Sequence, residues 1–236
     1  MTSEAVRPAK IGLVGGMSWH SSALYYARLN AAAEARFGPH ANLESVLVTV
    51  RFRDLLDRAG RGDWAAVEAA IVGAARHAER AGAEAILLTA FTAHFAAGAV
   101  AAAIDGPLLH AGDALAVECR SRGVRRVGLL GTAATLEAGV IAARLAANGI
   151  EALLPAAETA AAIDRVIREE LTLGHASDAA GAALDRAVAA LAGQGAEAVA
   201  LACTELPLLL PRPSPLPLID GVDAHVALAL DACTTF

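Results

Sequence analysis

Cys203 is the residue of this chain best placed for acid–base or nucleophilic chemistry. It lies in "ACTELP" (202–207), directly after an apolar stretch typical of a buried strand. Backbone N–H groups at such a turn favour a thiolate, whose ordinary pKa is about 8.5, whereas the carboxylate of Glu205 acts against it. Cys119 and Cys233 fall within helical patterns and are interpreted as packing residues. Cys203 is therefore predicted to be the reactive thiol.

A glycine-containing loop, "GGMSWHSS" (15–22), follows the first apolar stretch. Its backbone N–H groups could bind an anion, because glycine permits close approach and a helix is predicted to start just after it. The loop has neither GxGxxG nor GK[ST], so nucleotide binding is not predicted. A tight turn between a strand and a helix would need glycine in any case.

Several other polar residues also follow predicted strands. Arg51 and Arg53 could bind a carboxylate, or could simply be surface arginines. Asp220 and Asp223 are candidates for the site or for a helix N-cap. His94 either caps a helix start or lines the site. The histidines form no HxH or HExxH motif, so no metal site is predicted.

Short apolar stretches alternate with longer helical patterns along the chain. This alternation predicts parallel sheets covered by helices on both faces, with ligands beyond the carboxyl ends of the strands. Strands are expected at 11–15, 45–50, 85–89, 107–109, 126–130, 150–154, 197–202 and 217–219. Helices are expected at 21–36, 64–81, 94–103, 111–122, 135–148, 158–171, 177–193 and 222–233.

An internal repeat divides the chain into two halves. "GAEAILLTAFT" aligns with "GAEAVALACTE", "IGLVGG" with "VGLLGT", and "PLLHAGDA" with "PLIDGVDA", in the same order. The predicted fold is α/β, with two pseudo-symmetric domains that each contain a four-stranded parallel sheet flanked by helices. The active site is expected in the interdomain cleft. The first domain is assigned to 1–107 with 218–236, and the second to 108–217.

The repeat aligns Cys203 with Ala90, in the stretch "ILLTAFTAH" (86–94). Two opposed thiols would form a two-base site for proton transfer. Here Ala90 and the adjacent Phe91 can neither donate nor accept a proton, so one half of such a site is missing.

The composition narrows the class of protein. The net charge is −6 without a run of Lys or Arg, which argues against a nucleic acid or a membrane as partner. The three cysteines are widely spaced, which predicts reduced thiols in a cytoplasmic protein. No signal peptide is predicted. Residues 85–104 are long enough for a membrane span, which needs roughly 20 residues, but their alanines and polar residues favour a strand, a loop and a helix.

The quoted motifs resemble the aspartate/glutamate racemase family. "IGLVGGMSWHSSALYYARLN" (11–30) is similar to the family's opening motif, "ACTELPLLL" (202–210) to its second cysteine motif, and "PLIDGVDAH" (217–225) to its closing segment. The resemblance implies two pseudo-symmetric α/β domains, a homodimer, no cofactor and a small carboxylate substrate. It also implies that two cysteines act on opposite faces of the substrate's α-carbon.

Only some of the family's motif residues are present in this chain. Cys203 and Thr204 match the second motif, and Thr92 and His94 match the first, but Ala90 and Phe91 replace its Cys and Asn. The resemblance implies that carboxylates are held by the glycine loop, by hydroxyl residues and by an arginine. A lysine common in the family near position 162 is Ala162 here. The resulting substrate-binding candidates are Gly16, Met17, Ser18, Arg51, Phe91, Thr92, Thr132 and Thr204, with Glu205 and His94 as orienting residues.

Two-base racemisation requires an acid/base on each face of the carbon, and Ala90 cannot serve. Several reactions remain compatible with a single thiol. Cys203 could protonate a planar intermediate, as in the decarboxylation of a substituted malonate, or add to an unsaturated diacid for cis–trans isomerisation. A slow or one-way racemase would need water or Thr89 as the second base. A carboxylate-binding protein without catalysis is the alternative of a different class.

Overall fold

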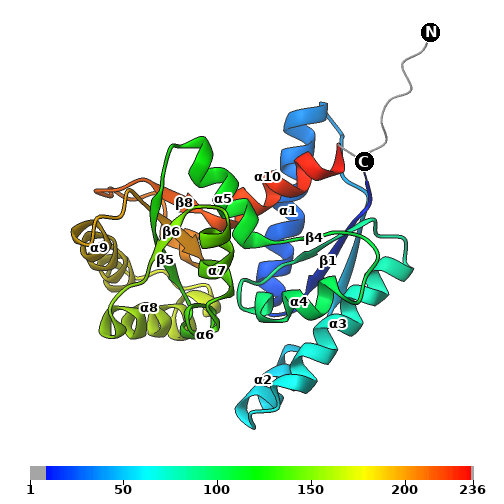
Figure 1. The fold of residues 1–236 in the computed structure, drawn as a ribbon, viewed down its shortest axis with the longest axis horizontal. Helices are drawn as coiled ribbons and strands as arrows, with labels where there is room; N and C mark the ends of the chain where they lie inside the picture. Colours follow the sequence, from blue (N-terminus) through cyan, green and yellow to red (C-terminus); the bar gives the residue numbers. More distant parts are fainter. Residues whose placement is uncertain (1–8, 235–236) are drawn as a thin grey trace. The chain divides into compact units, whose positions relative to one another are not determined.

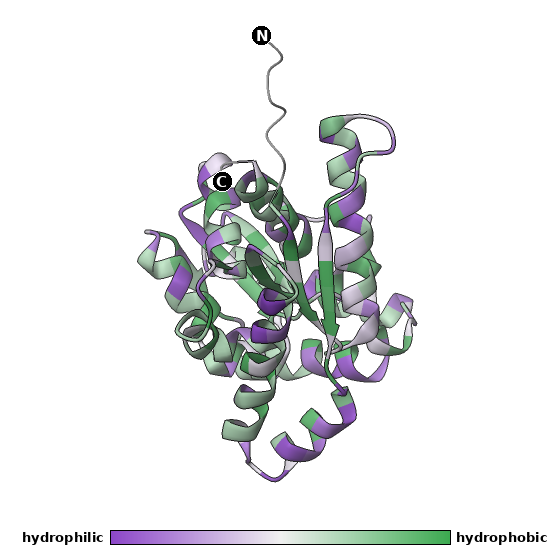
Figure 2. Ribbon diagram, turned by 90° about the vertical axis from the view of Figure 1, so that its right-hand side faces the viewer, coloured by the Kyte–Doolittle hydropathy of each residue, from purple (hydrophilic) through white to green (hydrophobic). Residues whose placement is uncertain are grey.

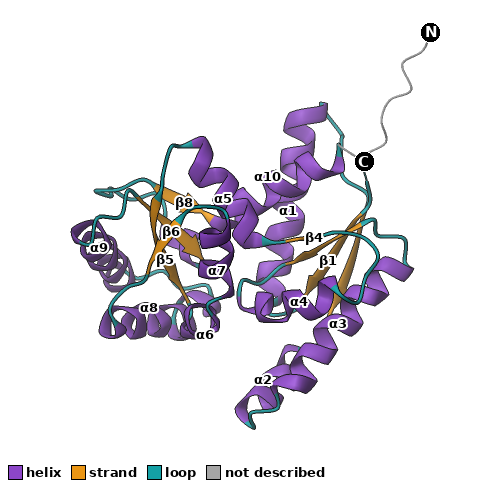
Figure 3. Cartoon of the chain, viewed as in Figure 1, coloured by secondary structure: helices purple, strands orange, loops and turns teal. Residues whose placement is uncertain are grey.

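The computed structural model describes residues 9–234, which divide into two compact units. One unit comprises the residues up to His110 together with those from Val226 onward, and the other comprises Ala111–His225. Both units are α/β (Figures 1 and 3).

The first unit alternates strands and helices. Its elements are β1 (Ile11–Gly15), α1 (Trp19–Phe37), β2 (Ser45–Thr49), α2 (Phe52–Gly60), α3 (Trp64–Arg80), β3 (Ala85–Leu88), the 3-10 helix η1 (Thr92–Ala96), α4 (Ala97–Ala101) and β4 (Leu108–Leu109). The last part of α10 (Gly221–Cys233) also belongs to this unit.

The second unit contains the equivalent series. Its elements are α5 (Ala111–Ser121), β5 (Arg126–Gly131), α6 (Ala133–Ala138), α7 (Val140–Ala147), β6 (Glu151–Leu153), α8 (Ala157–Glu169), η2 (Leu171–Leu173), α9 (Asp178–Gly193), β7 (Ala198–Ala202), η3 (Leu206–Leu209), β8 (Leu218–Asp220) and the start of α10.

The two sheets have the same topology. Each has four parallel strands, in the orders β2-β1-β3-β4 and β6-β5-β7-β8. Parallel strands require crossover connections, and helices supply them here. The predicted α/β fold with two four-stranded parallel sheets is thus confirmed.

A polar contact at the amino end of each sheet repeats as well. The Lys10 backbone N–H donates to the Glu84 carboxylate at 3.0 Å, and the Arg126 N–H donates to Glu197 at 3.1 Å. In return the Glu84 N–H donates to the Lys10 carbonyl and the Glu197 N–H to the Arg126 carbonyl, both at 2.8 Å. The repeat in the sequence therefore corresponds to a repeat in hydrogen bonding.

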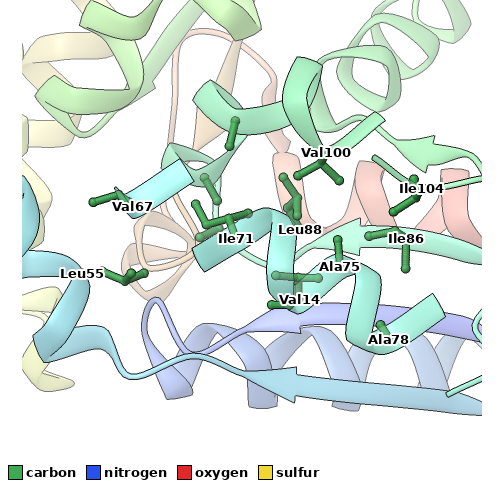
Figure 4. Packing of buried hydrophobic residues seen from close by; sticks show 14 of the residues in the cluster. Val14, Leu55, Val67, Ile71, Ala75, Ala78, Ile86, Leu88, Val100 and Ile104 are labelled. Atoms are coloured by element: carbon green, nitrogen blue, oxygen red, sulfur yellow. The ribbon is translucent and has the colours of Figure 1, made fainter. Parts of the chain in front are cut away.

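Apolar side chains from helices and strands form the core of the first unit (Figure 4). Val67, Ile71, Ala75 and Ala78 lie at helical spacing along α3 and are buried. They share a cluster with Val14 of β1 and with residues of β3. Full burial of a Val or Ile side chain contributes about 1.5–3 kcal/mol. Helices in Figure 2 carry both green and purple residues along their length, as amphipathic helices do.

The helices differ from the predicted ones in several places. The expected helix 94–103 consists of η1 followed by α4, and the expected helix 135–148 is divided into α6 and α7. Gly139, in a left-handed conformation, ends α6 and so causes the second division. A further difference is α2, which is not among the helices predicted from the sequence and which buries Leu55.

The apolar stretch 85–104 forms β3, η1 and α4 rather than one continuous helix. No helix within residues 9–234 is both long enough and apolar enough to span a membrane.

Candidate active site

The carboxyl ends of three neighbouring strands bring several candidates of the first unit together. Gly15 of β1 pairs with Thr49 of β2, and Val14 pairs with Leu88 of β3. The glycine loop, Arg51 and Ala90 each follow one of these paired residues directly or within two positions. This is the edge at which parallel sheets bind ligands.

The glycine loop is shaped by hydrogen bonds within the protein. Gly16 has a φ of 95°, and a Cβ there would collide with the Val50 carbonyl oxygen. The Gly16 N–H donates to the Ser22 Oγ at 2.8 Å, and the Ser22 hydroxyl donates to the Ser18 carbonyl at 3.1 Å. The Ser18 Oγ accepts from the Ser21 N–H at 3.3 Å and so caps α1. The Gly16 N–H therefore holds the loop in place, while Met17 and Ser18 are half-buried.

Thr89 belongs to the same buried network. Its Oγ1 donates to the Val14 carbonyl at 3.3 Å and lies 3.2 Å from the Ser22 Oγ. The Ser21 hydroxyl donates to the Thr89 carbonyl. Since Thr89 has no exposed surface, its hydroxyl contributes to the structure of the loop and is poorly placed to act as a second base.

Ala90 and Phe91 are both buried, with 7% and 3% of their surface exposed. Ala90 belongs to the apolar cluster of the first unit, with Val14 and Leu88. Position 90 therefore carries a methyl group among apolar side chains, whereas the equivalent position in the second half of the repeat carries the thiol of Cys203.

His94 stabilises the backbone of this loop. It has no exposed surface, and its Nδ1 lies 3.1 Å from the Ala90 carbonyl oxygen and 3.2 Å from that of Phe91. A proton on Nδ1 would be donated to both carbonyls. The His94 ring also packs edge-on against that of His110, with ring centres 4.7 Å apart. These contacts hold the backbone at Ala90 and Phe91, and a role of His94 in orienting groups of the site stays a prediction.

Arg51 and Arg53 lie at the start of the unpredicted helix α2. Arg51 occupies the N-cap position, where its side chain makes no capping hydrogen bond. Both arginines are exposed. Arg51 lies two residues after the last residue of β2, Thr49, and remains the better placed of the two arginines at this edge of the sheet.

In the second unit, Thr132 and Cys203 each directly follow the last paired residue of neighbouring strands β5 and β7. Gly131 pairs with Ala202, so these two residues are the next ones along adjacent strands. The Thr132 Oγ1 accepts from the Thr135 N–H at 3.2 Å and caps α6.

Asp164 also supports this loop, because its carboxylate accepts from the Ala133 N–H at 2.9 Å. No motif in the sequence marks Asp164, so this contact could not be predicted from the sequence. Ala162, at the position of the missing lysine, lies in α8 and is half-buried.

Cys203 is a buried thiol in contact with a carboxylate. Only 5% of its surface is exposed, and its Sγ donates to the Glu205 Oε2 at 3.2 Å. Burial raises the pKa of Cys203 well above its ordinary value, and the charge of Glu205 raises it further. The backbone N–H groups of Glu205 and Leu206 lower this pKa, but they are outweighed. Cys203 is thus a thiol at neutral pH, and the expected stabilisation of a thiolate by N–H groups is the smaller effect.

The remaining candidates have structural positions. Cys119 and Cys233 are buried, and burial raises the pKa of each to about 11. Asp220 accepts from the Val222 N–H at 2.8 Å, so it, rather than Asp223, caps the start of α10. In the described part of the chain, no three His, Cys, Asp or Glu side chains come together in a way that could hold a metal ion.

Comparisons with known proteins indicate the family of this chain. The family model described as Asp/Glu/Hydantoin racemase matches residues 14–229. A candidate Asp/Glu racemase from Yersinia pestis is 34% identical, with 95% of this chain and 99% of that chain covered and a TM-score of 0.88. An aspartate racemase homologue from Pyrococcus horikoshii OT3 is 28% identical, with 96% and 99% covered and a TM-score of 0.84. An aspartate racemase from Picrophilus torridus shares the fold, at 20% identity, 95% and 94% coverage and a TM-score of 0.73.

Proposed function

Because the chain belongs to the Asp/Glu/hydantoin racemase family, we propose that it catalyses proton chemistry at the carbon α to a carboxylate. The substrate is a small carboxylic or amino acid, and Cys203 is the single thiol acid/base. The family resemblance inferred from the sequence motifs is confirmed by the family match, and an enzyme of racemase type is supported by the structural relatives.

The observation that carries this proposal is the environment of Cys203. The thiol directly follows the carboxyl end of β7, as Thr132 directly follows that of the neighbouring strand β5, and a carboxylate oxygen lies 3.2 Å from its sulfur. A buried, oriented S–H group can donate its proton to a carbanion-like carbon, and the resulting thiolate can take a proton back. Ala90 at the equivalent position can do neither, so the chemistry is one-sided.

Substrate carboxylates are assigned in this proposal to polar groups at the carboxyl ends of the strands. Ser18 and Thr132 lie at the start of helices α1 and α6, where the helix dipole favours a negative charge. Arg51 could add a charged hydrogen bond. Such groups would also stabilise negative charge on the carboxylate as the α-carbon loses a proton or a substituent.

Exchange of the α-hydrogen in D₂O tests the proposal. The protein is incubated with L- or D-aspartate and L- or D-glutamate, and loss of the α-proton signal is followed by NMR. We expect exchange at the α-carbon that Cys203→Ala abolishes and that Cys119→Ala leaves unchanged. Exchange that survives Cys203→Ala would refute the role of Cys203. Thermal stabilisation by a carboxylate, without any turnover, would instead indicate a binding protein.

Decarboxylation of a substituted malonate is the second candidate, favoured by the protonated state of Cys203 and the apolar pair Ala90 and Phe91. The bond from the α-carbon to one carboxylate breaks, CO₂ leaves, and the electron pair stays on the α-carbon and the remaining carboxylate. The Cys203 S–H then protonates that carbon, and solvent returns a proton to the thiolate. Apolar surroundings favour loss of a desolvated carboxylate. Phenylmalonate and methylphenylmalonate are suitable probes, with CO₂ release as the readout for both and product chirality as a second readout for methylphenylmalonate.

A further inference from the structure

Two hydrogen-bond donors converge on one carboxylate oxygen beside Cys203. The Glu205 Oε2 accepts from the Cys203 Sγ at 3.2 Å and from the Thr204 Oγ1 at 2.6 Å. Glu205 precedes η3, so its side chain reaches back along the chain to the two residues before it. An ionised acceptor strengthens both hydrogen bonds and fixes the orientation of both donors.

Burial differs sharply among these three residues. Cys203 and Thr204 are 5% and 6% exposed, whereas Glu205 is half-buried and reaches solvent. The cluster that contains Cys203 is otherwise made of apolar residues, including Leu130, Leu201 and Leu206. Glu205 is the charged group that acts on the thiol. It therefore provides a polar connection between a buried sulfur and water.

This arrangement belongs to one half of the repeat only. The residue equivalent to Glu205 in the first half is Thr92, which carries no acid. The carboxylate thus accompanies the thiol and is missing where the thiol is missing.

We propose that Glu205 is a positioning residue that keeps Cys203 in the thiol form and returns a proton to it from solvent after each donation. The inference rests on the proposed role of Cys203 as acid/base. When Cys203 gives its proton to carbon, the S–H bond breaks and the electron pair stays on sulfur. The carboxyl group of Glu205, protonated by solvent, then gives its proton to the sulfur and becomes a carboxylate again.

The resting protein is consequently a proton donor. A substrate suits such a site when its carbanion forms without proton removal by Cys203, as it does on loss of CO₂. Removal of an α-proton by Cys203 would first require transfer of the thiol proton to Glu205, which is 3.2 Å away.

The experiment measures the ionisation of Cys203 without any substrate. Iodoacetamide alkylates thiolates, and mass spectrometry of the Cys203 peptide gives its rate between pH 7 and 10, with the Cys119 and Cys233 peptides as internal controls. Glu205→Gln keeps the size of the side chain and removes its charge, so the pKa of Cys203 should fall. A fall of one unit gives about tenfold faster alkylation below the pKa. Glu205→Asp should retain most of the wild-type profile, and Glu169→Gln, an exposed residue of α8, should change nothing.

An unchanged alkylation profile in folded Glu205→Gln would overturn the inference. If Glu205→Gln does not fold, Thr204→Val provides the second test, because the carboxylate loses one donor and acts more strongly on the thiol. Alkylation of Cys203 should then become slower than in wild type, and an unchanged or faster rate would count against the inference. Because this titration needs no turnover, its outcome is independent of the α-hydrogen exchange that tests the proposed function.

Discussion

Ala90 and Cys203 occupy equivalent positions in the two sheets. Ala90 lies two residues after Leu88, which pairs with Val14 of the inner strand β1, and Cys203 lies two residues after Leu201, which pairs with the equivalent Leu130 of β5. Both residues are buried in the apolar cluster of their own unit. The two halves therefore differ at this position by a thiol, within a shared backbone framework.

Restoring a thiol at position 90 should create two-base chemistry. We expect Ala90→Cys with Phe91→Asn to raise racemisation of aspartate or glutamate by about 10²-fold, the usual lower contribution of a positioned acid/base. Interconversion of the enantiomers is measured by chiral chromatography. Ala93→Cys, which places a thiol nearby in the buried 3-10 helix η1, is the matched control and should produce no gain. A folded double variant that is no faster than wild type would contradict the equivalence of the two positions.

The equivalence could be predicted from the sequence because the strands and their flanking residues repeat. "GAEAILLTA" and "GAEAVALAC" share both the apolar pattern and the turn before it. Helix α2 could not be predicted in this way. Its nine residues include two Asp and two Arg and bury only Leu55, so the helix depends on packing against the core.

The protonation state of Cys203 could not be predicted from the sequence, for a different reason. Both opposing influences, the backbone N–H groups and Glu205, were evident in the sequence, but their balance depends on how deeply the sulfur is buried. The network of Ser22 and Thr89 was missed for a related reason. These two residues lie 67 positions apart, and only the register of β1 with β3 brings their hydroxyls within 3.2 Å.

Ser22 should contribute strongly to the stability of the glycine loop. Ser22→Ala removes the acceptor of the buried Gly16 N–H and a neighbour of the Thr89 hydroxyl. A buried polar group left without its partner costs about 1–3 kcal/mol, so the free energy of unfolding should fall by that amount. Chemical denaturation measures it. Ser121→Ala, at an exposed helix end, should cost less than about 0.5 kcal/mol. Equal effects of the two variants would argue against the network.

Gly16→Ala tests whether the loop depends on the close approach of its backbone to Val50. Gly16 and Gly38 have similar φ values, 95° and 102°, but a Cβ at Gly16 would meet the Val50 carbonyl, whereas a Cβ at Gly38 would meet nothing within 4 Å. Gly38→Ala should therefore show backbone strain alone, about 1–3 kcal/mol. Gly16→Ala should lose clearly more free energy of unfolding. A loss no greater than that of Gly38→Ala would show that the loop can relax around the added methyl group.

Cys119 should make the protein less stable at alkaline pH. Burial, with a smaller effect of the Glu118 carboxylate, raises the pKa of Cys119 from 9.0 to about 11. The unfolded chain therefore releases this proton at lower pH than the folded protein does, so the stabilisation is complete below pH 9 and is lost as the pH rises toward 11. Between pH 8 and 10, wild type should lose about 1 kcal/mol more free energy of unfolding than Cys119→Ala. Urea denaturation at the two pH values measures the difference, and because the cavity left by Cys119→Ala affects both values equally, the change with pH isolates the thiol. Identical pH dependences for wild type and the variant would show that the Cys119 thiol ionises at the same pH in the folded and unfolded states.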